Sequence, residues 1–230
     1  KSRLERVALT FNARIKATVD RPTSLAKFTA FVVQLNSVLE EQASLISAAE
    51  DVEALYEIGE QNGCEIQDAA RRELVLGGAH AQNPGVSTRD RYEESVHMAQ
   101  EYRSSAIKDM SKKLGNEVEA EKDVIYSSIT MIDSELLHTY TTDVDEVLQY
   151  LQQVEANIKS SEDKVKTFMD WQKLLGLPAF DWSSLDTLRQ SYREKNDLWT
   201  TIDNWNKLRT EYYTTPLIEI DIAVFQKEVD

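Results

Sequence analysis

The sequence predicts an all-α protein made of elongated, stacked bundles of long amphipathic helices. Apolar residues recur every three or four positions over long stretches, which is the period of a buried helix face. Gly and Pro are scarce, with 7 and 4 copies in 230 residues, whereas sheet sandwiches and barrels need many turns. Apolar residues make up 41% of the chain and charged residues 29%, a balance that suits helices with one buried and one solvated face.

The first 18 residues form the first expected element. Their apolar positions, with the next residue included, are Leu4, Val7, Leu9, Phe11, Ile15 and Val19. This pattern leaves helix and strand open. We expect the end of an element whose partner lies upstream, and therefore an excerpt of a longer polypeptide.

The clearest element is a helix from near Ser24 to near Ile58. Its apolar seam alternates steps of three and four, with one step of seven, for more than four heptads. The seam consists of Leu25, Phe28, Val32, Leu35, Leu39, Ile46, Ala49 and Tyr56. At ~1.5 Å per residue this helix is about 50 Å long, which indicates an elongated bundle.

Start and stop signals flank this helix. Pro22 precedes it, and Thr23 or Ser24 is the expected N-cap. Gly59 is the expected stop, with a turn at Asn62-Gly63 beyond it.

A cluster of Gly, Asn and Pro predicts the strongest break in the chain, near residues 77–88. Gly77-Gly78 and Asn83-Pro84-Gly85 cannot both belong to a continuous helix.

Helical periodicity returns from about Thr88 to Trp171, where we expect two or three long helices. One stripe is Ile125, Ile129, Ile132, Leu136 and Tyr140; a second is Val144, Leu148, Leu151, Val154 or Glu155, Ile158, Val165 and Phe168. The candidate joints are Gly115-Asn116 and residues 141–143, where Thr142 and Asp145 resemble a capping box.

The last third contains a Gly cap, a Pro and a final helix. Gly176 and Pro178 end the preceding helix. The final helix carries Leu185, Leu188, Tyr192, Trp199, Ile202, Trp205 and Tyr212. It is expected to end near Pro216, followed by a short extended or turn segment and then a further helix capped by Asp221.

Charge and composition exclude several functional classes. The formal charge of −14 disfavours nucleic acid and anionic lipid as partners, because both attract cations. No apolar run reaches the roughly 20 residues that span a bilayer, and the N-terminus has no apolar signal-peptide core. The single cysteine, Cys64, excludes an intramolecular disulfide and fits a reducing compartment. The composition therefore indicates a soluble, helical, protein-binding chain.

Histidine spacing gives little support for a metal site. A carboxylate-bridged metal centre in a helical bundle needs paired Glu-x-x-His motifs that face inward. Glu135 and His138 form one such motif; Glu94 precedes His97 at the same offset but among polar neighbours, and His80 has no such partner. We therefore expect no metal ligands and no cofactor, and a metal analysis would decide this reading.

No catalytic constellation stands out either. Acidic neighbours raise a thiol pKa, so Cys64 beside Glu65 and Asp68 is a poor nucleophile. Neither a P-loop nor a dinucleotide-binding glycine motif occurs, so we expect the chain neither to bind nor to hydrolyse ATP. The basic pairs Arg71-Arg72 and Lys112-Lys113 are too small for a nucleic-acid footprint. The catalytic, cofactor-binding and metal-binding residues predicted here are therefore none.

All four tryptophans lie between positions 171 and 205. At helical spacing, packing is favoured over a ligand pocket. Trp199 and Trp205 are six apart on one helix and point about 120° away from each other, so they cannot form one aromatic sandwich. We expect each to meet a neighbouring helix or the segment after Pro216.

Two stretches resemble the tail of dynein heavy chains. The first runs from Arg21-Pro22-Thr23-Ser24-Leu25 to Tyr56, with Ile66 after the turn. The second begins at Leu174-Leu175-Gly176-Leu177-Pro178 and continues through Trp182, Leu185, Leu188, Leu198-Trp199, Trp205, Tyr212, Pro216-Leu217 and Ile220-Asp221. Trp182 stands where the family commonly has Tyr, and Tyr212 or Tyr213 stands where a Trp is common. The resemblance covers about residues 20–70 and 165–230, with the middle consistent by periodicity.

The resemblance implies a non-catalytic region of a microtubule motor whose ATPase ring lies elsewhere in the chain. Residues 1–175 would be a helical-bundle segment of the tail, and residues 176–230 the junction and the first helices of the linker. The implied partners are other dynein heavy chains, intermediate or light chains, and docking proteins of the microtubule doublet. The resemblance is closer to the axonemal branch, which implies the axoneme of a cilium or flagellum, or alternatively the cytoplasm.

An unrelated helical scaffold or adaptor is the alternative. A spectrin-like array would repeat at ~100 residues with a recurrent Trp, whereas the tryptophans here occur in one place. The flanking sequence would separate the two readings, because a downstream AAA+ region would identify a motor chain.

Overall fold

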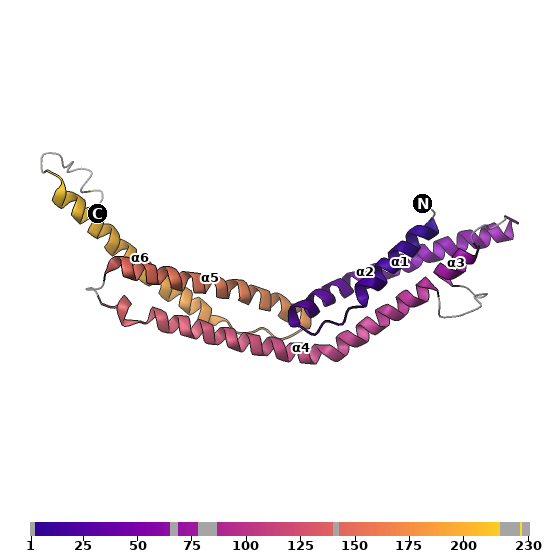
Figure 1. Ribbon diagram of the computed structural model, residues 1–230, viewed down its shortest axis with the longest axis horizontal. Coiled ribbons are helices and arrows are strands. Elements are labelled where there is room, and N and C mark those ends of the chain that lie inside the picture. The colour runs from indigo at the N-terminus through magenta and orange to yellow at the C-terminus, as the bar shows by residue number, and fades with distance from the viewer. Residues whose placement is uncertain (1–2, 65–68, 78–86, 140–142, 217–225, 227–230) are drawn as a thin grey trace. The chain divides into compact units, whose positions relative to one another are not determined.

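The computed structural model describes residues 3–64, 69–77, 87–139, 143–216 and 226 (Figure 1). Every regular element within these residues is a helix, which confirms the all-α prediction. The elements are α1 (Arg3–Thr18), α2 (Leu25–Gln61), α3 (Ala69–Leu76), α4 (Thr88–Ile132), the short 3₁₀ helix η1 (Glu135–Leu137), α5 (Val144–Leu175) and α6 (Ser183–Thr214). The N-terminal element, left open between helix and strand, is therefore helical. None of the helices in these described ranges is both long and apolar enough to cross a membrane.

The chain forms two compact units. Unit 1 comprises Lys1–Gly115 with Asp170–Pro178, and unit 2 comprises Asn116–Met169 with Ala179–Asp230. Helices α4 and α5 contribute residues to both units. The boundary between tail and linker near residue 175 concerns function and stays a prediction.

The core of unit 1 joins its four helices. Its buried members are Leu4, Val7 and Phe11 of α1, Val38, Ala49 and Val52 of α2, Val75 and Leu76 of α3, and Tyr92 and Val96 of α4. The rings of Phe11 and Tyr92 are 5.0 Å apart between centroids. Every residue of the predicted seam in α2 is buried or half-buried. The buried face is wider than that seam, because Phe31 and Val38 are buried as well.

The ends of α2 correct one prediction. Ser24 is the N-cap as expected, although its side chain makes no capping hydrogen bond. Gly59 does not stop the helix, which continues to Gln61. The left-handed residue is Gly63, with φ +69°, and it allows the backbone N–H of Cys64 to donate to the carbonyl of Gly59 at 2.9 Å. A glycine by itself does not end a helix. The helix ends where a residue with positive φ lets the following backbone N–H groups donate to the last helical carbonyls.

Gly77 and Ser87 bound the predicted break. Gly77 has φ +74° directly after α3, and Ser87 caps α4: its Oγ accepts from the N–H of Asp90 at 3.0 Å and donates to the Asp90 carboxylate at 2.6 Å. Ser87 is thus an N-cap whose hydroxyl accepts from a backbone N–H of the first turn and is held in place by the Asp90 carboxylate. The intervening residues 78–86, with their Gly, Asn and Pro, lie outside the described part.

The predicted joint at Gly115-Asn116 is wrong, because α4 runs through it without interruption. A glycine inside a helix costs only about 1 kcal/mol, and Leu114 and Val118 keep one face of α4 buried across this point. The boundary between the two compact units does fall between Gly115 and Asn116. Gly115-Asn116 therefore marks a change between compact units within α4 and not a turn.

Unit 2 packs the end of α4 from Asn116 on, most of α5, and α6 around an aliphatic core. Its buried residues are Ile125, Ile132, Leu137, Val147, Leu151, Val154, Ile158, Val165, Leu185, Leu188 and Trp199. Val154, rather than Glu155, continues the predicted stripe of α5.

The cap at the start of α5 is Asp143 rather than the predicted Thr142, because α5 begins at Val144, whereas the end of α5 follows its sequence signal. At the start of α5 the carboxylate of Asp143 accepts from the N–H of Asp145 at 2.9 Å; Thr142, the predicted cap, lies outside the described residues. Gly176 has φ +67° and ends α5 as predicted, with the N–H of Leu177 donating to the carbonyl of Gln172 at 3.0 Å. The end of α6 at Thr214 agrees with the prediction, whereas the expected segment at 217–221 and the cap at Asp221 fall in undescribed positions.

Candidate functional site

Trp199 is a packing residue, as its spacing predicts. Only 2% of its surface is exposed, and its indole Nε1 donates to the carbonyl of Leu137 at 3.3 Å. The hydrogen bond satisfies the one polar atom of a buried indole. Trp199 therefore fixes α6 to the turn after α4 and offers nothing to a ligand.

For Trp205 the same prediction stays open. Half of its surface, 50%, is exposed, so the described helices do not bury it fully. The other expected partner, the segment after Pro216, lies outside the described residues. The core contacts of α6 end with Ile202, which packs against the edge of the unit 2 core.

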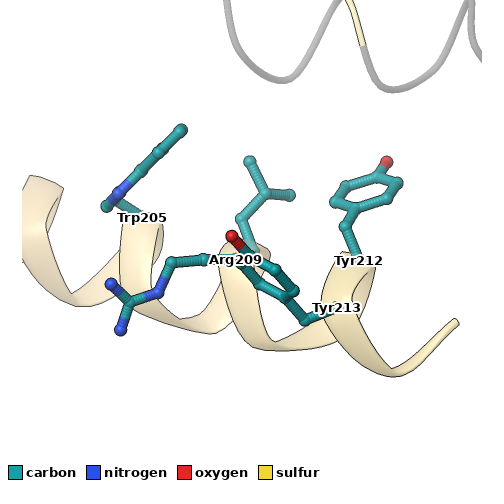
Figure 2. A pocket seen from close by; sticks show the side chains of 5 residues that line it. Trp205, Arg209, Tyr212 and Tyr213 are labelled. Carbon is teal, nitrogen blue, oxygen red and sulfur yellow. The ribbon is translucent and has the colours of Figure 1, made fainter.

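The last three turns of α6 carry a shallow depression, which we call the aromatic end of α6. Its lining residues in the described part of the chain are Trp205, Leu208, Arg209, Tyr212 and Tyr213, and it encloses about 320 Å³. Figure 2 shows Trp205 and Tyr212, seven residues apart, projecting from the same side of the helix, with Arg209 and Tyr213 on the adjoining side. Tyr213 is 85% exposed.

The charges around this end are few. Lys207 is paired with Asp203 at 2.7 Å, and this hydrogen bond raises the pKa of the Lys207 ammonium. Arg209 forms no ion pair with any residue that the structure describes. A free guanidinium beside aromatic rings suits a protein partner, since Arg, Trp and Tyr are the residues that most often anchor interfaces. The arrangement has no acid, base and nucleophile in mutual reach, so it is a candidate docking surface.

Sequence reasoning named Trp205 and Tyr212 but not Leu208, Arg209 or Tyr213 as members of one surface. The apolar period of α6 continues past Ile202 unchanged, and periodicity alone does not tell a covered face from an open one. Whether such a face is covered or open depends on its contacts with other segments or with a partner chain.

The residues weighed as metal ligands do not converge. The ring nitrogens of His138 lie 3.3 and 3.5 Å from the Nζ of Lys195, and an ammonium is no metal ligand. His97 is largely exposed and lies 3.7 Å from the carboxylate of Glu101. Across the described ranges, no group of three His, Cys, Asp or Glu side chains could hold a metal ion, and His80 falls outside those ranges. Cys64 is exposed and not in a disulfide.

A second hollow lies on unit 1 and is lined by residues of α2 and α4, mostly polar ones together with the buried Val96. Its lining includes Gln42, Glu93, His97, Gln100, Glu101 and Ser104. These polar side chains are exposed or half-buried, so water can satisfy their hydrogen-bonding groups. We therefore give the aromatic end of α6 more weight.

Comparison with known proteins gives one partial similarity. No family model matches the chain. Mouse dynein axonemal heavy chain 1 is 22% identical to it over 93 residues, which are 40% of this chain and 2% of the mouse protein. The chain thus corresponds to a very small part of that protein's length. The similarity indicates a relation to a segment of a dynein heavy chain.

Proposed function

We propose that this chain is a non-catalytic segment of a dynein motor heavy chain, from the tail where it leads into the first helices of the linker. The observation that supports this most is the combination of the partial similarity to an axonemal heavy chain with an architecture of long, uninterrupted helices. Helix α4 alone has 45 residues and α2 has 37. Helices of this length bury a continuous apolar stripe and transmit load along their axes.

Within that function the segment provides a mechanical connection and binds accessory or neighbouring chains in a microtubule motor complex. The aromatic end of α6 is the surface that we assign to such contacts, because Trp205 and Tyr213 are exposed there beside Arg209, which forms no ion pair with any residue that the structure describes. The proposed location is the cytoskeleton, in the axoneme of a cilium or flagellum.

The size of the natural polypeptide tests this assignment directly. The 93 matched residues amount to 2% of the mouse protein, which is therefore several thousand residues long. An antibody raised against this chain should detect a product of several hundred kilodaltons in isolated axonemes, and the transcript should encode an AAA+ region downstream. A product of about the size of this chain, 26.3 kDa, or a transcript without that region would exclude a motor heavy chain.

Nucleotide binding provides a second test. The purified chain should show no saturable binding of ATP at micromolar concentration, because it has no P-loop sequence. Saturable binding by isothermal titration calorimetry would contradict the non-catalytic assignment.

An unrelated helical scaffold remains the second candidate. The observation that favours it is the extent of the similarity, which leaves more than half of the chain unmatched. The transcript separates the two, since a scaffold would lack the downstream AAA+ region.

A further inference from the structure

The C-terminal third of α2 exposes two large apolar side chains that the core does not use. Leu55 is 50% exposed and Ile58 is 55% exposed. They are three residues apart and so lie on one side of the helix, together with the exposed Asp51 and Ala54. We call Asp51, Ala54, Leu55, Glu57 and Ile58 the acidic apolar face of α2.

This face points away from the core of unit 1. The core contacts of the same turns come from Ala49, Val52 and Tyr56. At 100° per residue these positions lie roughly opposite Ala54 and Ile58. A helix with apolar side chains at this spacing on both sides presents a second packing surface.

The surroundings of the face are strongly negative. From Phe28 to Cys64 the chain has no Lys or Arg, and it carries seven carboxylates: Glu40, Glu41, Glu50, Asp51, Glu53, Glu57 and Glu60. Three of those near the face are neutralised from neighbouring helices, because Arg89 of α4 lies 3.7 Å from Glu50 and 3.9 Å from Glu53, and Arg72 of α3 lies 2.6 Å from Glu60.

Asp51 and Glu57 are different. Both side chains are exposed, and neither forms an ion pair with a cation in the part of the chain that the structure describes. At 100° per residue, Asp51 lies on the same side as Leu55 and Ile58, one turn before Leu55, and Glu57 lies about 100° around the helix from Ile58. The result is a small apolar patch with two nearby carboxylates that form no ion pair with any residue the structure describes.

We propose that this face docks a basic amphipathic helix of a partner protein. The apolar stripe of that helix would cover Leu55 and Ile58, and its flanking Lys or Arg side chains would pair with Asp51 and Glu57. A symmetric contact with a second copy is disfavoured, because it would bring the same carboxylates together. This inference deepens the partner-binding part of the proposed function, but its test does not depend on whether the chain is a dynein segment.

Synthetic peptides test the proposal with the full chain. The probe is a fluorescein-labelled peptide of about three heptads with Leu at positions a and d and Lys at e and g. A second peptide carries Glu in place of Lys, and a third has the Lys peptide's composition in scrambled order. Fluorescence anisotropy should show saturable binding of the Lys peptide only.

Two double variants locate the site. Leu55→Ser with Ile58→Ser should weaken binding of the Lys peptide about tenfold, and Asp51→Lys with Glu57→Lys should weaken it about tenfold and allow the Glu peptide to bind. The matched apolar control is Val33→Ser, also on α2 and 58% exposed. The matched charge control is Glu117→Lys with Asp123→Lys, two exposed carboxylates on α4. Neither control should change the affinity by more than about twofold.

Several results would overturn the proposal. These are failure of the Lys peptide to bind, equal binding of the scrambled peptide, and equal losses in the control variants. A dimer in analytical ultracentrifugation that Leu55→Ser with Ile58→Ser abolishes would instead show a second copy as the occupant. If the Leu55 and Ile58 variant fails to fold, the charge-reversal variant with its exchanged peptide preference decides alone, because its substitutions are at exposed positions.

Discussion

The two units of this chain use different side chains for the same purpose. Unit 1 packs aromatic rings against one another: Phe11 lies 5.0 Å from Tyr92, and Phe31 lies 5.6 Å from Tyr102 between ring centroids. Unit 2 has an aliphatic core in which Trp199 is the only fully buried aromatic among the residues of its core cluster.

Both units bury polar groups, and each has at least one without a hydrogen-bond partner among the described protein atoms; in unit 2 this is Nε1 of Trp182. In unit 1 the hydroxyl of Tyr92 is buried without a hydrogen-bond partner among the protein atoms described. In unit 2 the carboxylate of Glu121 is buried and accepts from Ser161 Oγ at 2.7 Å and from Lys164 Nζ at 2.8 Å. The comparison teaches that an amphipathic pattern fixes which face is buried, while the cost of each buried polar atom depends on its own neighbours.

The largest expected effect is that of Trp199→Ala. It removes the one large ring of the unit 2 core and the hydrogen bond to Leu137, and should lower the free energy of unfolding of unit 2 by about 3–5 kcal/mol. Hydrogen exchange should become faster in α6 and in the parts of α4 and α5 that belong to unit 2. Protection in α2, which belongs to unit 1, should persist.

Trp205→Ala is the matched control, because it removes the same side chain from a half-exposed position of the same helix. It should cost less than about 1 kcal/mol. Uniform loss of protection along the chain in the Trp199 variant would show one cooperative core and would refute the comparison between units. Equal costs for the two variants would refute the difference in burial.

Much of the fold could be predicted from the sequence because the strongest signals are local. The seam of α2 and the Gly176 cap each depend on residues within a few turns, and both appear as expected. The predicted helix end at Gly59 and the predicted joint at Gly115 are wrong. A glycine lowers helix stability only slightly, and the packing of the residues on either side outweighs that loss. The exposure of Trp205 depends on which other segments pack against that part of α6. The spacing of residues along α6 alone does not reveal this.

An effect smaller than that of Trp199→Ala is expected for Glu121, the buried carboxylate of unit 2. Glu121→Leu removes both acceptors and leaves the buried hydroxyl of Ser161 without its partner, so it should cost about 1–3 kcal/mol in chemical denaturation. The control Glu117→Leu, on an exposed position of the same helix, should stay within about 0.5 kcal/mol. Adding Ser161→Ala to Glu121→Leu should recover part of the loss, and strictly additive costs would show that the two side chains are not coupled.

A smaller loss is expected for Tyr102→Phe in unit 1. The hydroxyl of Tyr102 donates to the carbonyl of Pro22 at 2.5 Å and ties α4 to the connection before α2. Losing this bond should cost about 1 kcal/mol, while the ring keeps its contacts with Phe28 and Phe31. Tyr126→Phe, at a position that is 57% exposed, is the control and should leave the denaturation midpoint unchanged. A midpoint for Tyr102→Phe equal to that of the unmodified chain would show that the hydrogen bond contributes nothing net.

The smallest effect, with the opposite sign, is expected for Tyr92→Phe. Its hydroxyl lost its water on burial and gained no partner among the described protein atoms, so removing it should leave the stability at pH 7 unchanged or raise it by up to about 1 kcal/mol. Burial raises the pKa of Tyr92 above its usual value near 10; the charge of Arg14 opposes this shift, and the charges of Glu41 and Glu93 add to it. The unfolded chain therefore releases this proton first as the pH rises past about 10, and the stability of the unmodified chain falls until the pH exceeds the folded pKa. Tyr92→Phe lacks that component, so its advantage should grow above pH 10 in urea denaturation, with Tyr213→Phe at an 85% exposed position as the control. A loss of about 1 kcal/mol at pH 7, as for Tyr102→Phe, would show that the Tyr92 hydroxyl is hydrogen-bonded after all.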